Sequence, residues 1–316
     1  MRPSRRQMLA LLGASIAAGT ARGAGAATPG LAEAARAAGV TYGASIASDT
    51  LADPAQALLY RRETAILTVD YALKFNWLRP SADVFAPGEA DAILAFAGDT
   101  PVRGHTLAWN ETRPDWLMAM SAAEKRRMFD RVVNEPFWPG HGLPGGYRDG
   151  PWMEAFGEAY VERAFRRAHA IDPNVPLVLN EAMTERWDAE GGAIRSGLLG
   201  LVDRLQDAGV RLDAVGLQRH LLPGYPYDDN AFADFVAELA TRNIDIYITE
   251  LDVDDQSFPR DIADRDAAVA ARYRDFLTAV LAVPAVKMVI TWQLADSSSW
   301  YYRGELERHP SAARLP

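Results

Sequence analysis

Short runs of apolar residues alternate along the chain with longer stretches in which apolar side chains recur every three or four positions. The short runs predict eight strands, at Thr41–Ile46, Ala65–Val69, Val102–Ala108, Arg131–Asn134, Leu177–Asn180, Ala214–Gln218, Ile244–Thr249 and Val286–Trp292. Several of these runs are apolar throughout, as expected for strands that are covered on both faces. This alternation is typical of a parallel sheet with crossover helices.

The longer stretches predict amphipathic helices. Trp152–Ala170 has apolar side chains on one face and charged side chains on another, and it predicts one continuous helix. Asp264–Ala282 repeats this spacing. So does the segment Leu198–Leu205, whose helix is expected to end near Gly209.

Eight alternations in one continuous chain predict a (β/α)₈ barrel, the TIM barrel. The competing architecture is an open doubly wound sheet, which usually carries a glycine-rich phosphate loop after its first strand. The corresponding segment here, Ser45–Ser48, contains no glycine. The sequence therefore favours the barrel.

Polar residues stand at the end of almost every predicted strand. In chain order they are Asp70, Lys74, Arg103, His105, Trp109, Asn110, Asn134, Glu135, Asn180, Glu181, Gln218, Arg219, His220, Glu250, Asp252, Trp292 and Gln293. Because the chemistry of a barrel takes place at the carboxyl ends of its strands, we expect these side chains to meet at one mouth. They predict an open, acidic cleft with aromatic walls.

Two glutamates that project into one cleft suit the cleavage of a glycosidic bond. One donates a proton to the leaving oxygen, and the other attacks the anomeric carbon if the two carboxyl groups stand about 5–5.5 Å apart. A metal site is the competing use of acidic residues with histidines. The five histidines show no HExxH-type spacing, however, and the acidic residues do not cluster with them. The sequence therefore predicts no metal site.

The formal net charge of −9 at pH 7 argues against a polyanion such as nucleic acid as the partner. It is compatible with a neutral polysaccharide. The chain contains no cysteine, which excludes disulfides, a thiol nucleophile and thiolate metal ligands.

The N-terminal residues have the pattern of an export signal. Arg5 and Arg6 precede a short apolar run, Leu9–Ala18, and the small residues Ala24–Ala26 offer a cleavage site. The run is too short to span a bilayer, and the paired arginines are typical of the twin-arginine type. We expect a signal peptide over residues 1–26 and a catalytic barrel over residues 27–316, periplasmic or extracellular and not attached to a membrane after cleavage. A Sec signal or a retained anchor is the alternative.

Five segments resemble the motifs of one enzyme family and follow one another in that family's order. They are Arg103–Trp109, Val132–Glu135, Gly216–Leu221, Ile248–Val253 and Trp292–Asp296, the last followed by Trp300. On these motifs the chain resembles the glycoside hydrolase family 10 endo-1,4-β-xylanases from about Val40 to Trp300. The resemblance implies a (β/α)₈ barrel that needs no cofactor. It also implies retaining, endo-acting hydrolysis of β-1,4-xylosidic bonds in xylan or xylo-oligosaccharides by a two-glutamate double displacement.

At the matched positions, the resemblance implies that Glu135 is the acid/base and Glu250 the nucleophile. Asn134 is expected to hold the 2-hydroxyl of the sugar at the cleaved bond. His220 is expected to hydrogen-bond the nucleophile and to be oriented by Asp252. The remaining matches are expected to line the sugar sites: Lys74, His105, Trp109, Gln218, Trp292 and Trp300.

Three positions depart from the family pattern. Asp70-Tyr71 stands where the family usually has Glu-Asn, whose asparagine binds the second sugar from the cleaved bond. Tyr71 therefore leaves the character of that sugar site open. Asn110 replaces a frequent histidine.

Two stretches are also shorter than in the family. Ser121–Phe129 predicts a helix with a capping box at Ser121 and Glu124, and it leads almost directly into Arg131–Asn134. We therefore expect a shortened third helix and fourth strand. Sixteen residues without a periodic apolar face follow Trp300, so the last helix is expected to be absent. A non-catalytic or degraded sugar-binding barrel, and a β-1,4-glucanase of the same fold, stay as alternatives.

Overall fold

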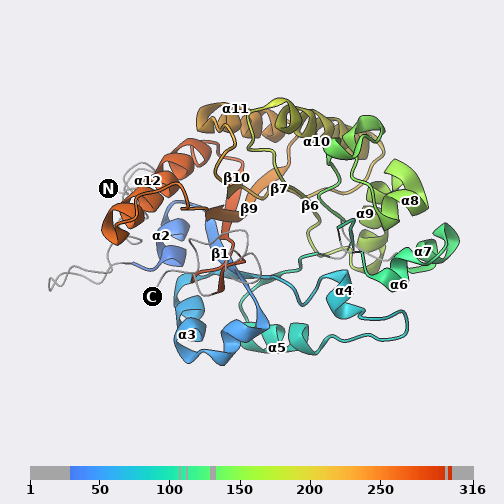
Figure 1. Ribbon diagram of the computed structural model, residues 1–316, viewed down its shortest axis with the longest axis horizontal. Coiled ribbons are helices and arrows are strands. Elements are labelled where there is room, and N and C mark those ends of the chain that lie inside the picture. Colours follow the sequence, from blue (N-terminus) through green and yellow to red (C-terminus); the bar gives the residue numbers. More distant parts are fainter. Residues whose placement is uncertain (1–28, 107, 112, 129–132, 296–297, 301–316) are drawn as a thin grey trace.

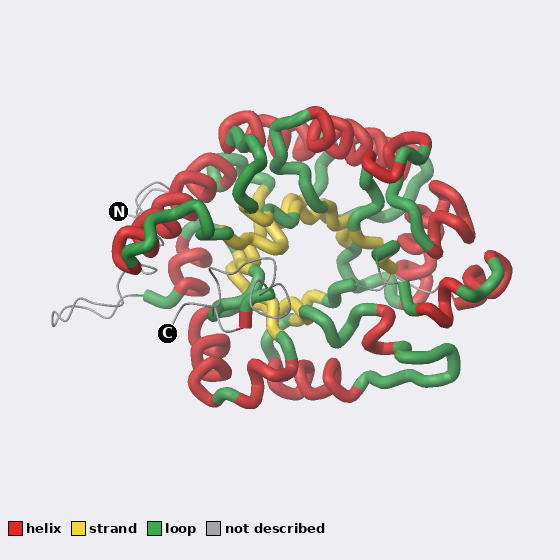
Figure 2. The backbone as a smooth tube through the Cα atoms, in the orientation of Figure 1, coloured by secondary structure: helices red, strands yellow, loops and turns green. Residues whose placement is uncertain are grey.

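The computed structural model describes residues 29–106, 108–111, 113–128, 133–295 and 298–300. Its strands form a ring at the centre of the molecule, and its helices lie around the outside of that ring (Figures 1 and 2). The predicted signal peptide and the predicted absence of a last helix concern residues 1–26 and 301–316, which lie outside the described residues.

Over the described residues, ten strands form one sheet. They are β1 Thr41–Ile46, β2 Ile66–Val69, β3 Val102–Arg103, β4 Ala108–Trp109, β5 Val133–Asn134, β6 Val178–Glu181, β7 Ala214–Leu217, β8 His220–Leu221, β9 Asp245–Val253 and β10 Val286–Thr291. Their order is β3-β2-β1-β10-β9-β7-β6-β5-β4, with β8 beside β9, and the pairs are parallel. Because β3 and β4, at the two ends of this order, are successive parts of one segment, the sheet curls round into a ring (Figure 2). The predicted (β/α)₈ barrel is confirmed.

The third predicted strand, Val102–Ala108, is wrong in its extent. Its first part, β3, pairs with β2, whereas β4 pairs with β5 on the other side of the ring. The chain leaves the strand pairing at Gly104–Thr106. This interval contains His105, whose Nε2 lies 3.8 Å from Glu250 Oε1, so the break occurs where the segment brings a side chain to the centre of the barrel.

The fourth strand is short over the part that the structure describes. β5 consists of Val133 and Asn134 and pairs with β4 on one side. On the other side, Asn134 pairs with Asn180 of β6. The predicted junction just before this strand falls in residues 129–132, which lie outside the described residues.

The α-helices of the described residues are α2 Leu31–Ala37, α3 Pro54–Glu63, α4 Phe75–Leu78, α5 Gly88–Ala97, α6 Asp115–Met118, α7 Ala122–Met128, α8 Pro151–Phe156, α9 Tyr160–Ile171, α10 Ala189–Asp207, α11 Asp229–Ala240 and α12 Ile262–Val280. Short 3₁₀ turns occur at Ser48–Ala52, Pro139–His141, Pro144–Gly146 and Gly157–Ala159. Within the part of the chain described here, no helix combines the length and the apolar character needed to cross a bilayer.

The single helix predicted over Trp152–Ala170 is wrong, because α8 and α9 are separated by the 3₁₀ turn Gly157–Ala159. Gly157 has φ 59°, in the left-handed region that glycine enters without steric cost and that ends a helix. The apolar spacing continues through this break, so periodicity alone could not reveal it.

The helix-terminus signals in the sequence are confirmed. Ser121 N donates to Glu124 Oε2 (2.8 Å) and Glu124 N donates to Ser121 Oγ (3.4 Å), which forms the predicted capping box of α7. Gly209, with φ 64°, follows the end of α10 as expected.

The main apolar core lies between the ring and the helices α9 to α12. It includes Leu198 and Val202 of α10, Phe232 of α11, Ile246 of β9 and Phe276 of α12, all fully or almost fully buried. A second cluster joins β1 and β2 to α3 and α5 through Ile46, Tyr60, Leu67 and Ile93. These contacts hold the strand bodies, so the side chains at the strand ends project from a packed scaffold.

Candidate active site

Every site residue predicted from the sequence belongs to one connected set of contacts at the carboxyl ends of the strands. The set comprises Lys74, His105, Trp109, Asn134, Glu135, Gln218, His220, Glu250, Asp252, Trp292 and Trp300. The residues that a barrel was expected to bring to one mouth are therefore together.

Glu135 follows β5 and is surrounded by hydrogen-bond donors. Its Oε1 accepts from Gln218 Nε2 (2.6 Å) and Asn134 Nδ2 (3.1 Å). Its Oε2 accepts from Trp109 Nε1 (3.0 Å) and Arg148 Nη2 (2.8 Å). With only 8% of the residue exposed, these four donors fix the direction in which the carboxyl group points.

The backbone of Glu135 is in the left-handed region, with φ 48°. Its N–H donates to the carbonyl oxygen of Asn180 (2.8 Å), and its own carbonyl oxygen accepts from Arg148 Nε (3.0 Å). Both sides of this turn are therefore tied to neighbouring segments, which hold the side chain at the mouth of the barrel.

Glu250 lies in β9 and is almost completely buried. Its Oε1 accepts from Asn180 Nδ2 (2.8 Å), and His220 Nε2 lies 3.4 Å from its Oε2. Burial would raise the pKa of this carboxyl group, but His105, His220 and Arg103 together outweigh that effect and lower it to about 2. Because burial lowers the pKa of His105 to about 3, this imidazole is neutral near pH 7, so we assign most of the stabilising charge to His220.

His220 is held between the carboxylates of Glu250 and Asp252. Its Nδ1 lies 2.8 Å from Asp252 Oδ1, while Asp252 Oδ2 accepts from Trp300 Nε1 (2.7 Å). Burial lowers the pKa of His220, but the two carboxylates outweigh burial and raise it well above the ordinary value. His220 therefore supplies a positive charge beside Glu250.

We expect Asp252→Asn to move the acid limb of kcat/KM against pH upwards by on the order of one pH unit. Without the Asp252 carboxylate, His220 loses its proton more readily, and the pKa of Glu250 then rises. The matched control is Asp254→Asn, because Asp254 binds Gln256 N and Nε2 and should not move the limb. A pH profile of Asp252→Asn that coincides with that of the unaltered chain would show that His220 does not set the ionisation of Glu250.

Two amide side chains connect the glutamates. Asn180 Nδ2 donates both to Glu250 Oε1 and to Asn134 Oδ1 (2.7 Å), and Asn134 in turn donates to Glu135. Thr249 Oγ1 donates to Asn180 Oδ1 (2.6 Å), which fixes the orientation of the amide. Gly216 is required beside it, since a Cβ there would lie 2.3 Å from Asn180 Oδ1. The two carboxylates are thus positioned by one rigid network.

Sequence reasoning did not assign a role to Arg148 or Asn180. Arg148 lies in a loop that carried no recognised motif, yet its guanidinium binds Glu135 and also pairs with Glu111. Asn180 was noticed only as a polar residue at a strand end. The glycine at position 216 of the neighbouring strand is a sequence feature that could have indicated a side chain close by.

Glu181, the residue after Asn180, is completely buried below the site. Its two oxygens accept from the backbone N–H groups of Ala182 (2.9 Å) and Phe137 (3.3 Å). Burial, together with the nearby charge of Glu135, raises its pKa well above the ordinary value. Glu181 is therefore held in place by the backbone beside Glu135, and burial favours its neutral form.

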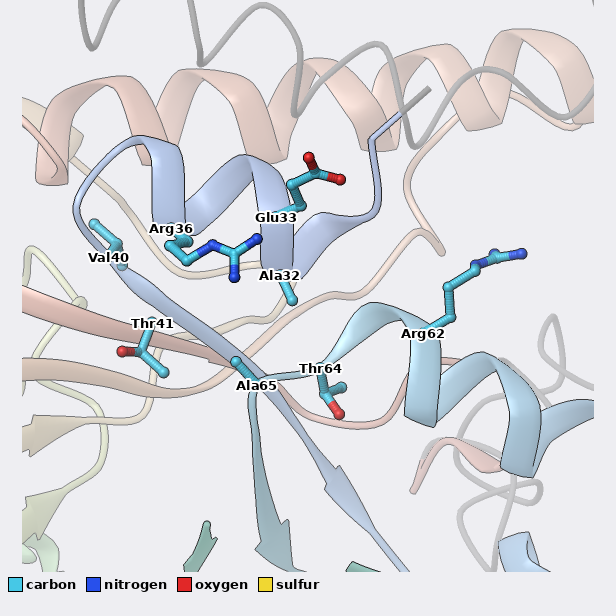
Figure 3. A pocket seen from close by; sticks show the side chains of 8 residues that line it. All are labelled: Ala32, Glu33, Arg36, Val40, Thr41, Arg62, Thr64 and Ala65. Carbon is cyan, nitrogen blue, oxygen red and sulfur yellow. The ribbon is translucent and has the colours of Figure 1, made fainter. Parts of the chain in front are cut away.

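A hollow elsewhere on the molecule is separate from these residues (Figure 3). It is lined by Ala32, Glu33, Arg36, Val40, Thr41, Arg62, Thr64 and Ala65. Because Thr41 begins β1 and Ala65 precedes β2, the hollow lies at the amino ends of these strands, opposite the mouth. Among the described residues, no group of three or more histidine or acidic side chains is arranged to hold a metal ion.

The chain is similar to known proteins over most of its length. Residues 30–312 match the sequence model of glycosyl hydrolase family 10. The chain is 32% identical over 296 residues to endo-1,4-beta-xylanase A of Cellvibrio japonicus, covering 78% of this chain and 47% of that protein. It is 27% identical over 265 residues to endo-1,4-beta-xylanase B of Thermotoga neapolitana, covering 76% of this chain and 72% of that protein. Its structure is similar to that of xylanase B from Clostridium stercorarium F9, with a TM-score of 0.72, 26% identity, and coverage of 86% of this chain and 91% of that one.

Proposed function

Because this chain belongs to glycosyl hydrolase family 10, we propose that it hydrolyses β-1,4-xylosidic bonds within xylan, with retention of configuration. The family and the barrel predicted from the sequence are both confirmed. The chain spans about half the length of the Cellvibrio relative and nearly three quarters of the Thermotoga one, so the proposal concerns the activity of this barrel.

The connection of Glu135 to Glu250 through Asn134 and Asn180 is the observation that carries the proposal. Each glutamate has its own set of partners, and the two sets differ in kind. Glu250 is kept ionised beside the His220 cation, as a nucleophile requires. Glu135 is oriented by neutral amide and indole donors and by Arg148, as a group that must meet the leaving oxygen in one direction requires.

The reaction we assign to this pair has two steps. A Glu250 oxygen attacks the anomeric carbon, the bond to the leaving oxygen breaks, and the proton of Glu135 passes to that oxygen. Glu135, now a carboxylate, then takes a proton from water as the water oxygen attacks the anomeric carbon and releases Glu250. The two inversions together retain the configuration of the sugar.

The remaining residues would bind the sugar rings. The indoles of Trp292 and Trp300 stand around His220, at ring-centroid distances of 6.3 and 5.4 Å, and offer flat apolar faces beside the nucleophile. Asn134, placed between the glutamates, is suited to the 2-hydroxyl of the sugar whose bond is cleaved.

Export of the protein by a twin-arginine signal in residues 1–26 stays a prediction from the sequence.

The test is a comparison of purified chain on soluble β-1,4-xylan and on a soluble β-1,4-glucan, with reducing ends and product lengths measured. We expect short xylo-oligosaccharides to appear from xylan at a rate at least about tenfold above the rate on the glucan, because one misfitted substituent in a sugar site costs roughly 1–3 kcal/mol. Faster hydrolysis of the glucan would favour the β-1,4-glucanase alternative. A folded chain that binds xylan without cleaving it would favour the non-catalytic one.

A further inference from the structure

Trp77 is a large aromatic side chain left 45% exposed on the short helix α4. Its ring stacks on that of Tyr71, with 5.4 Å between centroids and an interplanar angle of 29°. Single exposed apolar side chains are common on protein surfaces and by themselves indicate little. Trp77 differs from these because its indole is stacked on the ring of Tyr71, and this contact fixes the plane of the indole.

This aromatic pair is continuous with the catalytic residues. Lys74 Nζ lies 4.6 Å from the centre of the Tyr71 ring and 5.1 Å from that of Trp109. Trp109 Nε1 in turn donates to Glu135. The contacts therefore run from the exposed Trp77, through Tyr71 and the Lys74 ammonium, to the acid/base.

The composition of this surface indicates the ligand. A flat, fixed indole face binds the C–H face of a pyranose ring by dispersion and by exclusion of water. Beside Tyr71, the partly exposed Lys74 ammonium can donate to a hydroxyl group. The buried Asp70 carboxylate, which accepts from Gln293 Nε2, lies 3.9 Å from this ammonium and helps to hold it in place. A sugar chain can use both parts of this surface, the ring face and the ammonium.

We infer that Tyr71 and Trp77 form a stacking platform for a sugar ring of the substrate chain, farther from the cleaved bond than the sugar beside Lys74. The inference rests on the proposed function for the identity of the chain that extends through the cleft. The platform recognises the ring face rather than a pattern of hydroxyl groups. It therefore contributes to binding only when the substrate is long enough to reach it.

The first measurement is kcat/KM for xylohexaose and for an aryl β-xyloside. In Trp77→Ala we expect the ratio of the two values to fall about five- to tenfold, as loss of one aromatic stacking contact implies. Trp77→Phe should restore most of the ratio, since it keeps a flat ring. The control is Phe85→Ala, because Phe85 is 59% exposed in the same β2–α5 connection but lies against Arg79.

The second measurement is the affinity of Glu250→Gln for xylohexaose, by calorimetry, with and without Trp77→Ala. A lower affinity for xylohexaose in the double variant than in Glu250→Gln alone would support the platform. If the unaltered chain at the same time does not cleave xylan, the platform stands and the proposed function is overturned. Equal affinities, together with an unchanged kcat/KM ratio in Trp77→Ala, would overturn the platform and leave the proposed function standing. If Trp77→Ala does not fold, Trp77→Leu removes the flat ring while keeping an apolar side chain.

Discussion

Glu250→Ala is expected to lower kcat on xylan and on aryl β-xylosides by on the order of 10⁵-fold or more, as loss of a catalytic nucleophile does elsewhere. The reason lies in the charge of the site. The His220 cation, Asn180 and Arg103 are arranged around an ionised carboxylate, and an alanine leaves them without the group that attacks the anomeric carbon. Initial rates on both substrates, with far-UV circular dichroism as the check on folding, measure the effect.

Azide provides the control for that experiment. A small anion that enters the space left by the carboxylate should attack the anomeric carbon of an activated aryl glycoside and restore turnover. Because only one displacement then takes place, the product should be the α-xylosyl azide, with inverted configuration. Activity within tenfold of the unaltered chain in Glu250→Ala, without azide, would remove Glu250 from its role.

Glu135→Ala is expected to have an effect that depends on the leaving group. On xylan, where the leaving oxygen needs a proton, kcat should fall by about 10²–10⁴-fold, the usual contribution of general acid catalysis. On an aryl xyloside whose phenolate leaves without a proton, formation of the glycosyl-enzyme should be much less affected. The comparison of the two substrates isolates proton transfer from positioning.

The matched control is Glu111→Gln. Glu111 pairs with the same Arg148 that binds Glu135, but it is not itself in contact with the acid/base in the described contacts. A small loss of activity that is equal on both substrates is expected, since Glu111 acts only through the position of Arg148. If Glu135→Ala slows formation of the glycosyl-enzyme, measured as kcat/KM, equally on xylan and on the activated aryl xyloside, Glu135 is a positioning residue and not the acid.

The strands and the catalytic pair were accessible to sequence reasoning because their signals are local. Thr41–Ile46 is a strand with the bounds predicted, and Glu250 stands in an apolar run that becomes β9. The polar residues could be assigned to one mouth because parallel strands in a barrel all present their carboxyl ends on the same side. The resemblance to the family motifs then indicated that Glu135 is the acid/base and Glu250 the nucleophile. The spacing of these residues along the chain does not by itself distinguish the two roles.

The features that were missed depend on contacts between distant segments. Arg148 reaches Glu135 from a loop with no periodic pattern, and Asn180 meets Asn134 across 46 positions. The separation of α8 from α9 at Gly157 was hidden because apolar spacing continues through it. The third strand is divided because its first part, β3, pairs with β2, whereas its second part, β4, pairs with β5. These pairings are visible only in the closed ring.

The backbone of Glu135 sets stability and activity against each other at a single residue. A left-handed φ in a residue with a side chain of this size costs roughly 1–3 kcal/mol, a cost that glycine at the same position would avoid. A glutamate at this position therefore gives up part of the stability of the fold in exchange for a carboxyl group at the mouth of the barrel.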